Sequence, residues 1–305
     1  MKPFQQMRFE DLPEQPRVPH GFFELEEERL AVDSRAFGSI ELSVRRAGSG
    51  PPLVLVHGFM TSSYSFRYVI EPLARDYEVI VFDLPGAGRS DAPDVPYPPD
   101  ALADLIGEAM DKLGVTGSSV IGNSMGGYLA MRLALRRPDA MSRLVNLHSP
   151  GLATARMWAL EAVLHLPLTD PLVDLLVRRD PLRWAFRNVH YWDESLKSLE
   201  EAREYGGPLS TPEGRRAFIH YLGDTMRASH MREFERALDE LERFPIPLLM
   251  VYARRDPMVP PVVGERLAKL LPDAEMVWLE EGSHFAHVDA PEAFLAAARP
   301  FLERA

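Results

Sequence analysis

Cysteine is absent from the 305-residue chain, which excludes a disulfide framework and a thiolate metal site. No run of eighteen consecutive apolar residues occurs, so the sequence predicts no membrane-spanning helix. Basic residues are also few, with 34 Lys and Arg against 45 Asp and Glu, and they form no compact cluster. The resulting net charge of −11 repels phosphates, and we therefore expect no nucleic-acid partner.

Low-complexity tracts and internal repeats are missing as well, and 46% of the residues are hydrophobic, as in ordinary globular domains. The first twenty residues carry four prolines and no apolar stretch of the kind found in secretory signals. We therefore expect a globular cytoplasmic protein in which residues 1–21 form an N-terminal extension. The sequence leaves the oligomeric state open, a homo-oligomer included.

Short apolar runs rich in β-branched residues recur through the first half of the chain. They lie at 53–56, 79–82, 119–121 and 144–147, and they are preceded by a segment at 40–46 in which apolar and polar residues alternate. Segments with helical periodicity separate the later runs, at 101–113 and 125–137. Strands that are apolar along their whole length are buried on both faces, which is typical of a largely parallel α/β sheet.

After residue 150 the strand pattern gives way to helical segments, at 154–165, 172–177, 196–205, 212–228 and 231–244. Strand patterns return at 248–252 and 275–279, and a helix is expected at 291–302. Two strands and two helices are too few to cover a separate core. We therefore predict one α/β core, residues 22–150 and 245–305, into which residues 151–244 are inserted as a helical cap.

The segment Gly122-Asn123-Ser124-Met125-Gly126 lies between a predicted strand and a predicted helix. This is the G-x-S-x-G pattern in the strand–turn–helix context that holds a nucleophilic serine in a tight turn. Small residues two positions on either side let the strand and the helix approach closely. Ser124 is therefore the predicted nucleophile, and the alternative is an ordinary helix N-cap.

A serine nucleophile needs a general base and an acid that orients the base, both on loops that follow later strands. Asp256 follows the strand at 248–252, and His284 follows the strand at 275–279. We predict Asp256 as the acid and His284 as the base. His287 is the alternative base.

Glu280 and Glu281 are the alternative acids at this edge of the sheet. Both directly follow a strand end, where we expect them to be solvated.

The backbone N–H groups of Phe59 and Met125 are the predicted donors to an oxyanion, which needs two donors aimed at one point. Met125 directly follows the predicted nucleophile, and Phe59 lies in the loop after the strand at 53–56. Met60 is the second choice in that loop. His57, in the same loop, is expected to bond loop backbone.

The loop at 83–90 is rich in Gly and follows a predicted strand, but the chain contains neither of the two common phosphate-binding patterns. We expect this loop to border the site. Metal-ligand spacings such as H-E-x-x-H are also missing, so the sequence predicts no metal and no cofactor.

Five motifs in this order resemble the α/β-hydrolase superfamily over about residues 22–302. They are His57-Gly58-Phe59, Asp83 with Gly86-Ala87-Gly88-Arg89-Ser90, Gly122-Asn123-Ser124-Met125-Gly126-Gly127, Asp256 and His284. The resemblance implies an α/β-hydrolase fold with a mostly parallel eight-stranded sheet flanked by helices. It also implies a triad that works through an acyl-enzyme on a small-molecule substrate.

Comparison with subfamilies narrows the expected reaction. The segment 57–67 resembles haloalkane dehalogenases and epoxide hydrolases, but both use an aspartate where this chain has Ser124. The segment 122–127 is similar to carbon–carbon hydrolases that cleave vinylogous diketones, in which Trp usually follows the base; here Phe285 does. We therefore expect a carboxylesterase, with a carbon–carbon hydrolase as the alternative. A non-catalytic small-ligand receptor on the same fold is the alternative of another class.

Aromatic residues of the predicted cap are expected to roof an apolar pocket, although most of them should simply pack the cap against the sheet. They are Trp158, Trp184, Phe186 and Trp192. Such a pocket favours a small to medium, rather apolar ester.

Overall fold

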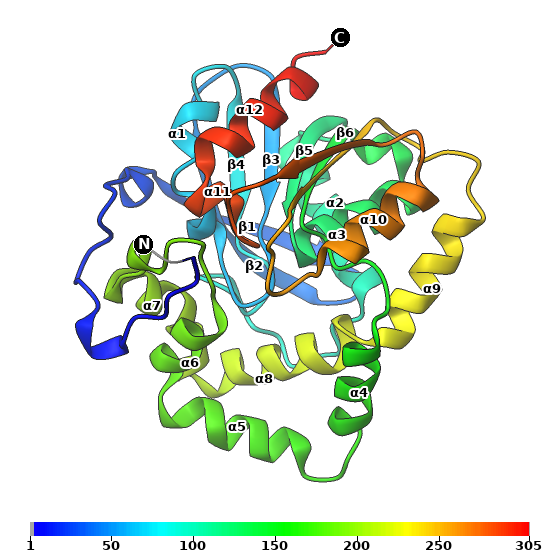
Figure 1. The fold of residues 1–305 in the computed structure, drawn as a ribbon. Coiled ribbons are helices and arrows are strands. Elements are labelled where there is room, and N and C mark those ends of the chain that lie inside the picture. The colour runs from blue at the N-terminus through cyan, green and yellow to red at the C-terminus, as the bar shows by residue number, and fades with distance from the viewer. Residues whose placement is uncertain (1–2, 305) are drawn as a thin grey trace.

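An eight-stranded sheet runs through the computed structural model, which describes residues 3–304 (Figure 1). The strands are β1 (Glu27–Ser34), β2 (Gly38–Ala47), β3 (Pro52–Val56), β4 (Glu78–Phe82), β5 (Ser118–Asn123), β6 (Met141–Leu147), β7 (Leu248–Ala253) and β8 (Glu275–Leu279). Their order in space is β1-β2-β4-β3-β5-β6-β7-β8. β2 is antiparallel to β1 and β4, and all other neighbours are parallel. The predicted mostly parallel eight-stranded sheet is confirmed.

Helices cover both faces of the sheet. On one face pack α2 (Pro99–Leu113), α3 (Met125–Arg136) and α10 (Pro261–Leu270). On the other face pack α1 (Ile70–Leu73), α11 (Ala286–Asp289) and α12 (Pro291–Leu302). The central strands are therefore shielded from water on both sides, which is why their sequences are continuous apolar runs.

Between β6 and β7 the chain forms the inserted helices, which lie beyond the end of the sheet at the bottom of Figure 1. They are α4 (Ala155–Leu164), α5 (Thr169–Arg179), α6 (Pro181–Asn188), α7 (Leu199–Gly206), α8 (Pro212–His220) and α9 (Ala228–Asp239). Among residues 3–304, no helix is both long and apolar enough to cross a membrane.

The helix predicted at 212–228 is correct for its first part only. α8 covers Pro212–His220, a π-helical turn follows at Tyr221–Thr225, and the helical path ends there before α9 begins at Ala228. The Thr225 hydroxyl donates to the Tyr97 carbonyl (2.6 Å), and the Tyr97 N–H donates to Asp224 (3.0 Å). These contacts with the core hold the turn in a wider helical form that local propensity does not predict.

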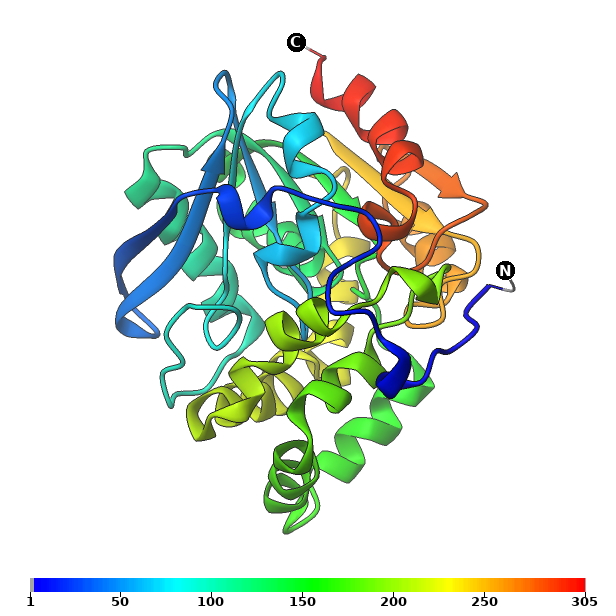
Figure 2. The ribbon, with the colours of Figure 1, turned by 90° about the vertical axis from the view of Figure 1, so that its left-hand side faces the viewer.

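Residues 3–24 form the N-terminal strap, the dark blue segment that crosses the molecule in Figure 2. The strap is hydrogen bonded to the start of α7, where the Leu199 N–H donates to the Pro13 carbonyl (2.9 Å). Near its other end, His20 Nε2 lies 2.9 Å from a carboxylate oxygen of Glu200 on α7 and 3.2 Å from the hydroxyl of Tyr64 in the core. The strap therefore joins the inserted helices to the core.

Candidate active site

Ser124 occupies the turn between β5 and α3, with φ 53° and ψ −120°. A positive φ is unfavourable for a residue with a side chain and persists only where the surroundings fix it. The Ser124 N–H donates to the Leu147 carbonyl (2.7 Å), and the Ser124 carbonyl accepts from the Tyr128 N–H (3.0 Å). Hydrogen bonds to the neighbouring strand β6 and to α3 thus fix the turn, which lies at the carboxyl end of the central strand β5.

The glycines around Ser124 are required by close approach of the chain. A Cβ on Gly126 would lie 2.2 Å from the Val56 carbonyl oxygen, and a Cβ on Gly122 would lie 2.6 Å from the Gly127 Cα atom. Both distances are far below van der Waals contact. The spacing of small residues in the motif is therefore the spacing at which β5, α3 and β3 touch.

Asp256 and His284 meet at this same edge of the sheet, on the loops after β7 and β8. His284 Nδ1 lies 2.7 Å from Asp256 Oδ2, and both side chains are almost completely buried. The other oxygen, Asp256 Oδ1, accepts the N–H groups of Met258 (2.7 Å) and Val259 (2.9 Å). Burial alone would raise the pKa of Asp256, but His284 and these N–H groups hold it below its usual value.

An ionised Asp256 can only accept hydrogen bonds, so the proton between the two side chains belongs to His284 Nδ1. The other ring nitrogen, Nε2, is then left as a proton acceptor. Asn123, the neighbour of Ser124, donates through Nδ2 to the His284 carbonyl (3.1 Å) and so ties the two loops together. Within residues 3–304 the Ser124 hydroxyl makes no hydrogen bond to the imidazole, a common state for such a pair before substrate binds.

The alternative residues do not share this arrangement. His287 is buried against Phe66, with ring centroids 4.9 Å apart, and neither of its nitrogens has a hydrogen-bond partner in the described chain. Burial holds the pKa of His287 well below its usual value. Glu280 and Glu281 are exposed, as expected.

The loop after β3 lies directly against Ser124, because a Cβ on Gly58 would be 3.0 Å from the Ser124 Cβ atom. In this loop the Phe59 N–H donates to no acceptor in residues 3–304. The Met125 N–H belongs to the first turn of α3, where helix N–H groups have no carbonyl partner within the helix. Two N–H groups without an acceptor in residues 3–304 therefore flank the serine, and they are the two that the sequence proposes as oxyanion donors.

Two further features of these loops are structural. His57 bonds loop backbone with both nitrogens: Nε2 accepts from the Leu84 N–H (2.9 Å), and Nδ1 lies 2.9 Å from the Gly58 carbonyl. Asp83 accepts the N–H groups of Ser63 (2.8 Å) and Arg89 (3.0 Å), which fixes the loop at 83–90 beside the site.

His148 is a residue of the site that sequence reasoning missed. It follows β6 directly, has a φ of 56°, and its ring centroid lies 5.6 Å from that of His284. Its Nε2 accepts from the Ala253 N–H (2.6 Å), and burial lowers its pKa to about 3. His148 is therefore neutral at physiological pH and brings no positive charge close to His284. Its position directly after a predicted strand was the one feature of the sequence that could have indicated a place at this edge of the sheet.

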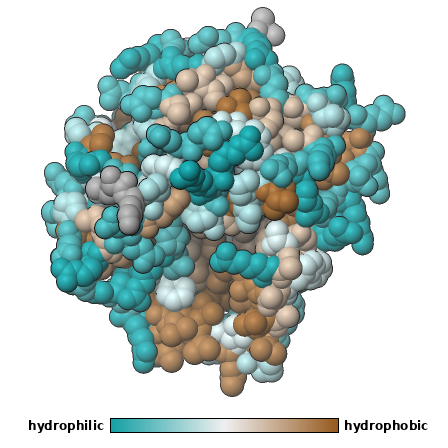
Figure 3. All heavy atoms as spheres, viewed as in Figure 1, coloured by the Kyte–Doolittle hydropathy of each residue, from teal (hydrophilic) through white to brown (hydrophobic). Residues whose placement is uncertain are grey.

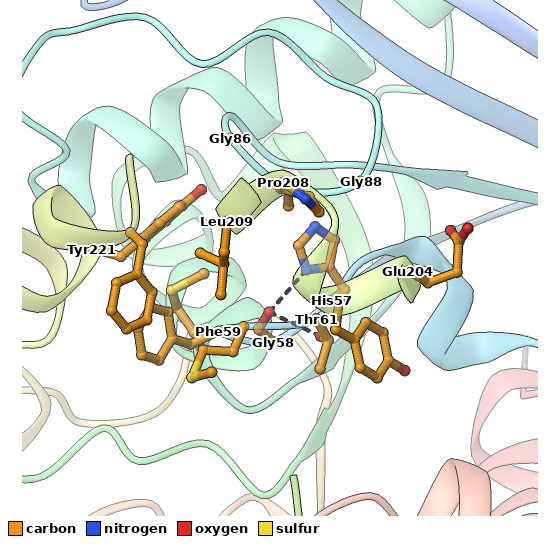
Figure 4. A pocket seen from close by; sticks show the side chains of 15 residues that line it. His57, Gly58, Phe59, Thr61, Gly86, Gly88, Glu204, Pro208, Leu209 and Tyr221 are labelled. Atoms are coloured by element: carbon orange, nitrogen blue, oxygen red, sulfur yellow. Dashed lines mark hydrogen bonds between the residues drawn. The ribbon is translucent and has the colours of Figure 1, made fainter. Parts of the chain in front are cut away.

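A small cavity opens beside Met125, between the core loops and the inserted helices (Figure 4). Its volume is about 30 Å³, which is room for one or two water molecules and far below the volume of an ordinary ligand site. Its lining from the inserted helices includes Glu204, Leu209, Phe218 and Tyr221. The ring of Phe59 stacks on Phe218 with centroids 5.3 Å apart.

The aromatic residues that were expected to roof this cavity mostly lie elsewhere. Trp184 packs edge-on against Phe218, with ring centroids 6.2 Å apart. Phe186 instead contacts Phe9 of the N-terminal strap, and Trp192 contacts Phe4. Trp158 is 47% exposed and faces solvent. Packing against the strap and exposure therefore account for three of the four.

No group of three or more His, Asp and Glu side chains in the described part of the chain is placed to hold a metal ion. The polar groups that converge at this edge are instead a hydroxyl, an imidazole paired with a carboxylate, and two free backbone donors. Such a set can activate a hydroxyl as a nucleophile and bind an oxyanion.

The chain is similar to known hydrolases in sequence and in fold. A family model described as "alpha/beta hydrolase fold" matches residues 51–291. The chain is 28% identical over 261 residues to a pimeloyl-[acyl-carrier protein] methyl ester esterase of Neisseria meningitidis, covering 82% of this chain and 92% of that protein. It is 26% identical over 284 residues to 2-hydroxy-6-oxo-6-(2'-aminophenyl)hexa-2,4-dienoic acid hydrolase of Metapseudomonas resinovorans, covering 88% and 89%. The solved structure of the epoxide hydrolase CorEH shares the fold, with a TM-score of 0.77 and 22% identity over 91% of this chain and 98% of that one.

Proposed function

We propose that this chain, which belongs to the alpha/beta hydrolase fold family, is a carboxylic-ester hydrolase with Ser124, His284 and Asp256 as its catalytic triad. The observation that carries the proposal is the buried Asp256–His284 pair, 2.7 Å apart, at the same sheet edge as the strained Ser124 turn. The inserted helices act as a cap over the site, and the substrate is a small to medium, rather apolar ester.

In the first half of the reaction, His284 Nε2 takes the Ser124 proton as the oxygen attacks the ester carbonyl carbon. The carbonyl π bond breaks, and its oxygen becomes an oxyanion that accepts from the N–H groups of Phe59 and Met125. Asp256 keeps the imidazole in the required tautomer and stabilises its positive charge. The oxyanion then collapses, the alcohol leaves with the proton from His284, and an acyl-enzyme is formed.

In the second half, His284 removes a proton from a water molecule that attacks the acyl carbon. The Ser124 oxygen leaves and recovers its proton from His284, which releases the carboxylic acid. The neutral His148 supports both halves, because a second positive charge near His284 would oppose protonation of the imidazole.

Carbon–carbon bond hydrolysis is the second candidate, and the similarity to the dienoic acid hydrolase of M. resinovorans favours it. It would use the same three residues. Epoxide hydrolysis through an alkyl-enzyme is disfavoured, since Ser124 stands where that chemistry uses an aspartate.

The test is hydrolysis of p-nitrophenyl esters from acetate to octanoate by the wild-type protein, Ser124→Ala and Ser149→Ala. Ser149 is a matched control, because it is buried near the site and its hydroxyl has no hydrogen-bond partner in the described chain. We expect Ser124→Ala to lose about 10⁴-fold or more in kcat. Ser149→Ala should keep most of the activity.

Equal, weak activity in Ser124→Ala and the wild type would contradict the proposal. Turnover of a coloured dienolate diketone, lost in Ser124→Ala, together with no ester turnover would favour carbon–carbon hydrolysis instead.

A further inference from the structure

Large apolar side chains are exposed mainly in one place, the α4–α5 segment (residues 155–179). Twelve large apolar residues are exposed in the described chain, and four of them (Val18, Phe23, Met258 and Val262) lie outside this segment. The other eight are Trp158, Leu160, Val163, Leu166, Leu168, Leu172, Leu175 and Leu176. Figure 3 shows them as the brown region at the lower end of the molecule, in the position of α4 and α5 in Figure 1.

The two helices that carry this surface are barely buried. α4 has no buried residue, and α5 has only Val177. On α5, Val177 is buried and Val173 packs in the same cluster, while Leu172, Leu175 and Leu176 are exposed. An apolar face of this size on the outside of a soluble domain indicates an interaction surface.

The tip between α4 and α5 is apolar where polar turn residues are usual. Leu166 and Leu168 flank a proline. Leu168 is 78% exposed, and it adopts a φ of 70°, which is unusual for a residue with a side chain. Two carbonyls next to the tip are bonded by side chains of the segment: His165 Nδ1 lies 2.7 Å from the Glu161 carbonyl, and the Thr169 hydroxyl donates to the Val163 carbonyl (2.9 Å).

The exposed charges beside this surface that form no ion pair are mostly positive, in contrast to the chain as a whole. The segment holds three acids as well, but Glu161 accepts hydrogen bonds from Ser229 and Asp174 pairs with Arg215. Arg156, Arg178 and Arg179 are exposed and form no salt bridge within residues 3–304. Arg179 follows Leu175 by four residues and Arg156 precedes Leu160 by four, so each guanidinium continues an apolar stripe. Asp170 is the one exposed acid of the segment for which no ion pair is formed in the described chain.

The net charge of −11 does not cancel this local field at an interface. Charges farther away than a Debye length of about 8–10 Å are largely screened at physiological salt. The three arginines next to the apolar face therefore contribute most to its electrostatic interaction with a membrane surface. Their positive charges attract anionic phosphates.

The composition of this surface is that of a segment that lies in a membrane interface. It joins exposed Trp and Leu side chains to flanking arginines. Such an amphipathic surface inserts its apolar side chains into the headgroup region of a bilayer, and its arginines contact the anionic headgroups.

We propose that the α4–α5 segment docks on the surface of an anionic lipid bilayer. Resting on the proposed function, the ester substrate is then a lipid-soluble one that enters from the bilayer. The inner face of α5 packs on Leu209 and Phe218, which line the cavity, so one layer of helix separates the lipid from the site. Displacement of this loosely held helix on docking enlarges a cavity that holds only one or two waters.

Binding is tested on Ser124→Ala protein, so that neither activity nor hydrolysis of the lipid enters the measurement. The probe is sedimentation with vesicles of phosphatidylcholine containing 30 mol% phosphatidylglycerol. The variant is Leu172→Gln with Leu176→Gln, which keeps side-chain size and helix propensity. Val262→Gln, an exposed apolar site on α10, is the matched control.

We expect the double variant to lower the partition coefficient at least tenfold and Val262→Gln to leave it unchanged. Replacing Arg178 and Arg179 by Gln should weaken binding about fivefold for each arginine, and only to vesicles that contain phosphatidylglycerol. Failure of Ser124→Ala to bind vesicles would overturn the proposal, as would binding that the double variant does not reduce. A dimer in sedimentation equilibrium that the double variant abolishes, without vesicle binding, would assign the surface to a second copy.

Activity gives a separate readout. The double variant in the active protein should keep its rate on soluble p-nitrophenyl acetate and lose at least tenfold on p-nitrophenyl palmitate held in vesicles. Loss on both substrates would overturn the lipid-entry step. Vesicle binding without any Ser124-dependent hydrolysis would instead contradict the proposed function alone.

Discussion

Two parts of the inserted segment, α7 and the α4–α5 segment, are held to the rest of the molecule very differently. α7 is anchored by ion pairs and hydrogen bonds: Arg67 pairs with Glu201 (2.6 Å), and Arg89 pairs with Glu204 through both guanidinium nitrogens. The Arg67 guanidinium is fully buried between the rings of Tyr64 and Tyr68, 4.4 and 4.6 Å from their centroids. The α4–α5 segment has neither buried ion pairs nor, apart from Val177, buried side chains.

This difference indicates which of the inserted helices can move away from the site. A buried ion pair cannot separate without leaving a charge unpaired in a dry environment, which costs several kcal/mol. α5 is held by one buried side chain and by the partly exposed ion pair of Asp174 with Arg215 on α8, so its separation costs less than that of a buried pair. Regions of low local stability supply the moving parts of binding sites. The comparison therefore predicts a fixed end at α7 and a movable end at α5. Four measurements would break or sharpen it.

The largest effect is expected at the fixed end. Glu201→Gln leaves the buried Arg67 without its counter-charge, and we expect the free energy of unfolding to fall by about 3–5 kcal/mol. Urea denaturation measures it. The double variant Arg67→Met, Glu201→Leu removes both charges and should recover most of the loss. A decrease below about 1 kcal/mol in Glu201→Gln would mean that α7 is not anchored in this way.

The next effect concerns Asp289, which accepts N–H groups from Trp192 of the inserted segment (2.6 Å) and from Ser283 next to His284 (3.2 Å). Burial raises the pKa of Asp289 from 3.8 to about 6. A carboxyl with a raised pKa favours folding below its unfolded pKa, and this contribution is lost as pH rises through the folded value. The wild type should therefore lose roughly 2–3 kcal/mol between pH 4 and pH 7 that Asp289→Asn does not lose.

The measurement is urea denaturation of both proteins across that pH range. Only the difference in slope is informative, because Asp256, with its lowered pKa, contributes with the opposite sign in both proteins. Parallel profiles would show that Asp289 is not the group that titrates.

A smaller effect is expected for the second ion pair of α7. The side chains of Arg89 and Glu204 are 40% and 14% exposed, so solvent screens their attraction. Glu204→Gln should lower the unfolding free energy by less than about 1 kcal/mol, and the difference should shrink in 1 M NaCl. If Glu204→Gln lowered the unfolding free energy as much as Glu201→Gln does, the Arg67–Glu201 pair would not be the main anchor of α7.

The smallest effect is expected at the movable end. Leu172→Ala should change the unfolding free energy by less than about 0.5 kcal/mol, because Leu172 is 54% exposed in the folded protein. Leu238→Ala, on α9 with a fully buried side chain, should cost about 2–5 kcal/mol. Hydrogen exchange should show the same contrast, with α5 amides exchanging faster than those of α7. Similar protection in α5 and α7 would remove the distinction between the two ends.

The sequence predicted the sheet, and it singled out the residues of the proposed triad, because both depend on local signals. A nucleophile turn needs small residues at fixed offsets from Ser124, and the ends of parallel strands meet at one edge, so Asp256 and His284 had to lie near each other. β1 was missed because it is an edge strand, mostly exposed and rich in charge.

The remaining features depend on contacts between residues far apart in the chain. Arg67 and Glu201 are 134 residues apart, and no pattern within either segment indicates that they meet. The outward position of Trp158 was hidden for a related reason. An apolar helix is normally assigned to a core, and only the arrangement of its neighbours shows that nothing covers it.

The N-terminal strap has a consequence for the order in which the molecule assembles. Its partners come late in the chain: Glu200 lies 180 residues after His20, and Arg203, which pairs with Glu14, lies 189 residues after it. Contacts between such distant positions form slowly, because a long loop must close first. We therefore expect the strap to dock last, after the sheet has formed and α7 has settled on it. In refolding experiments, the contacts between the strap and α7 should form in a slow final phase that follows the recovery of helical structure.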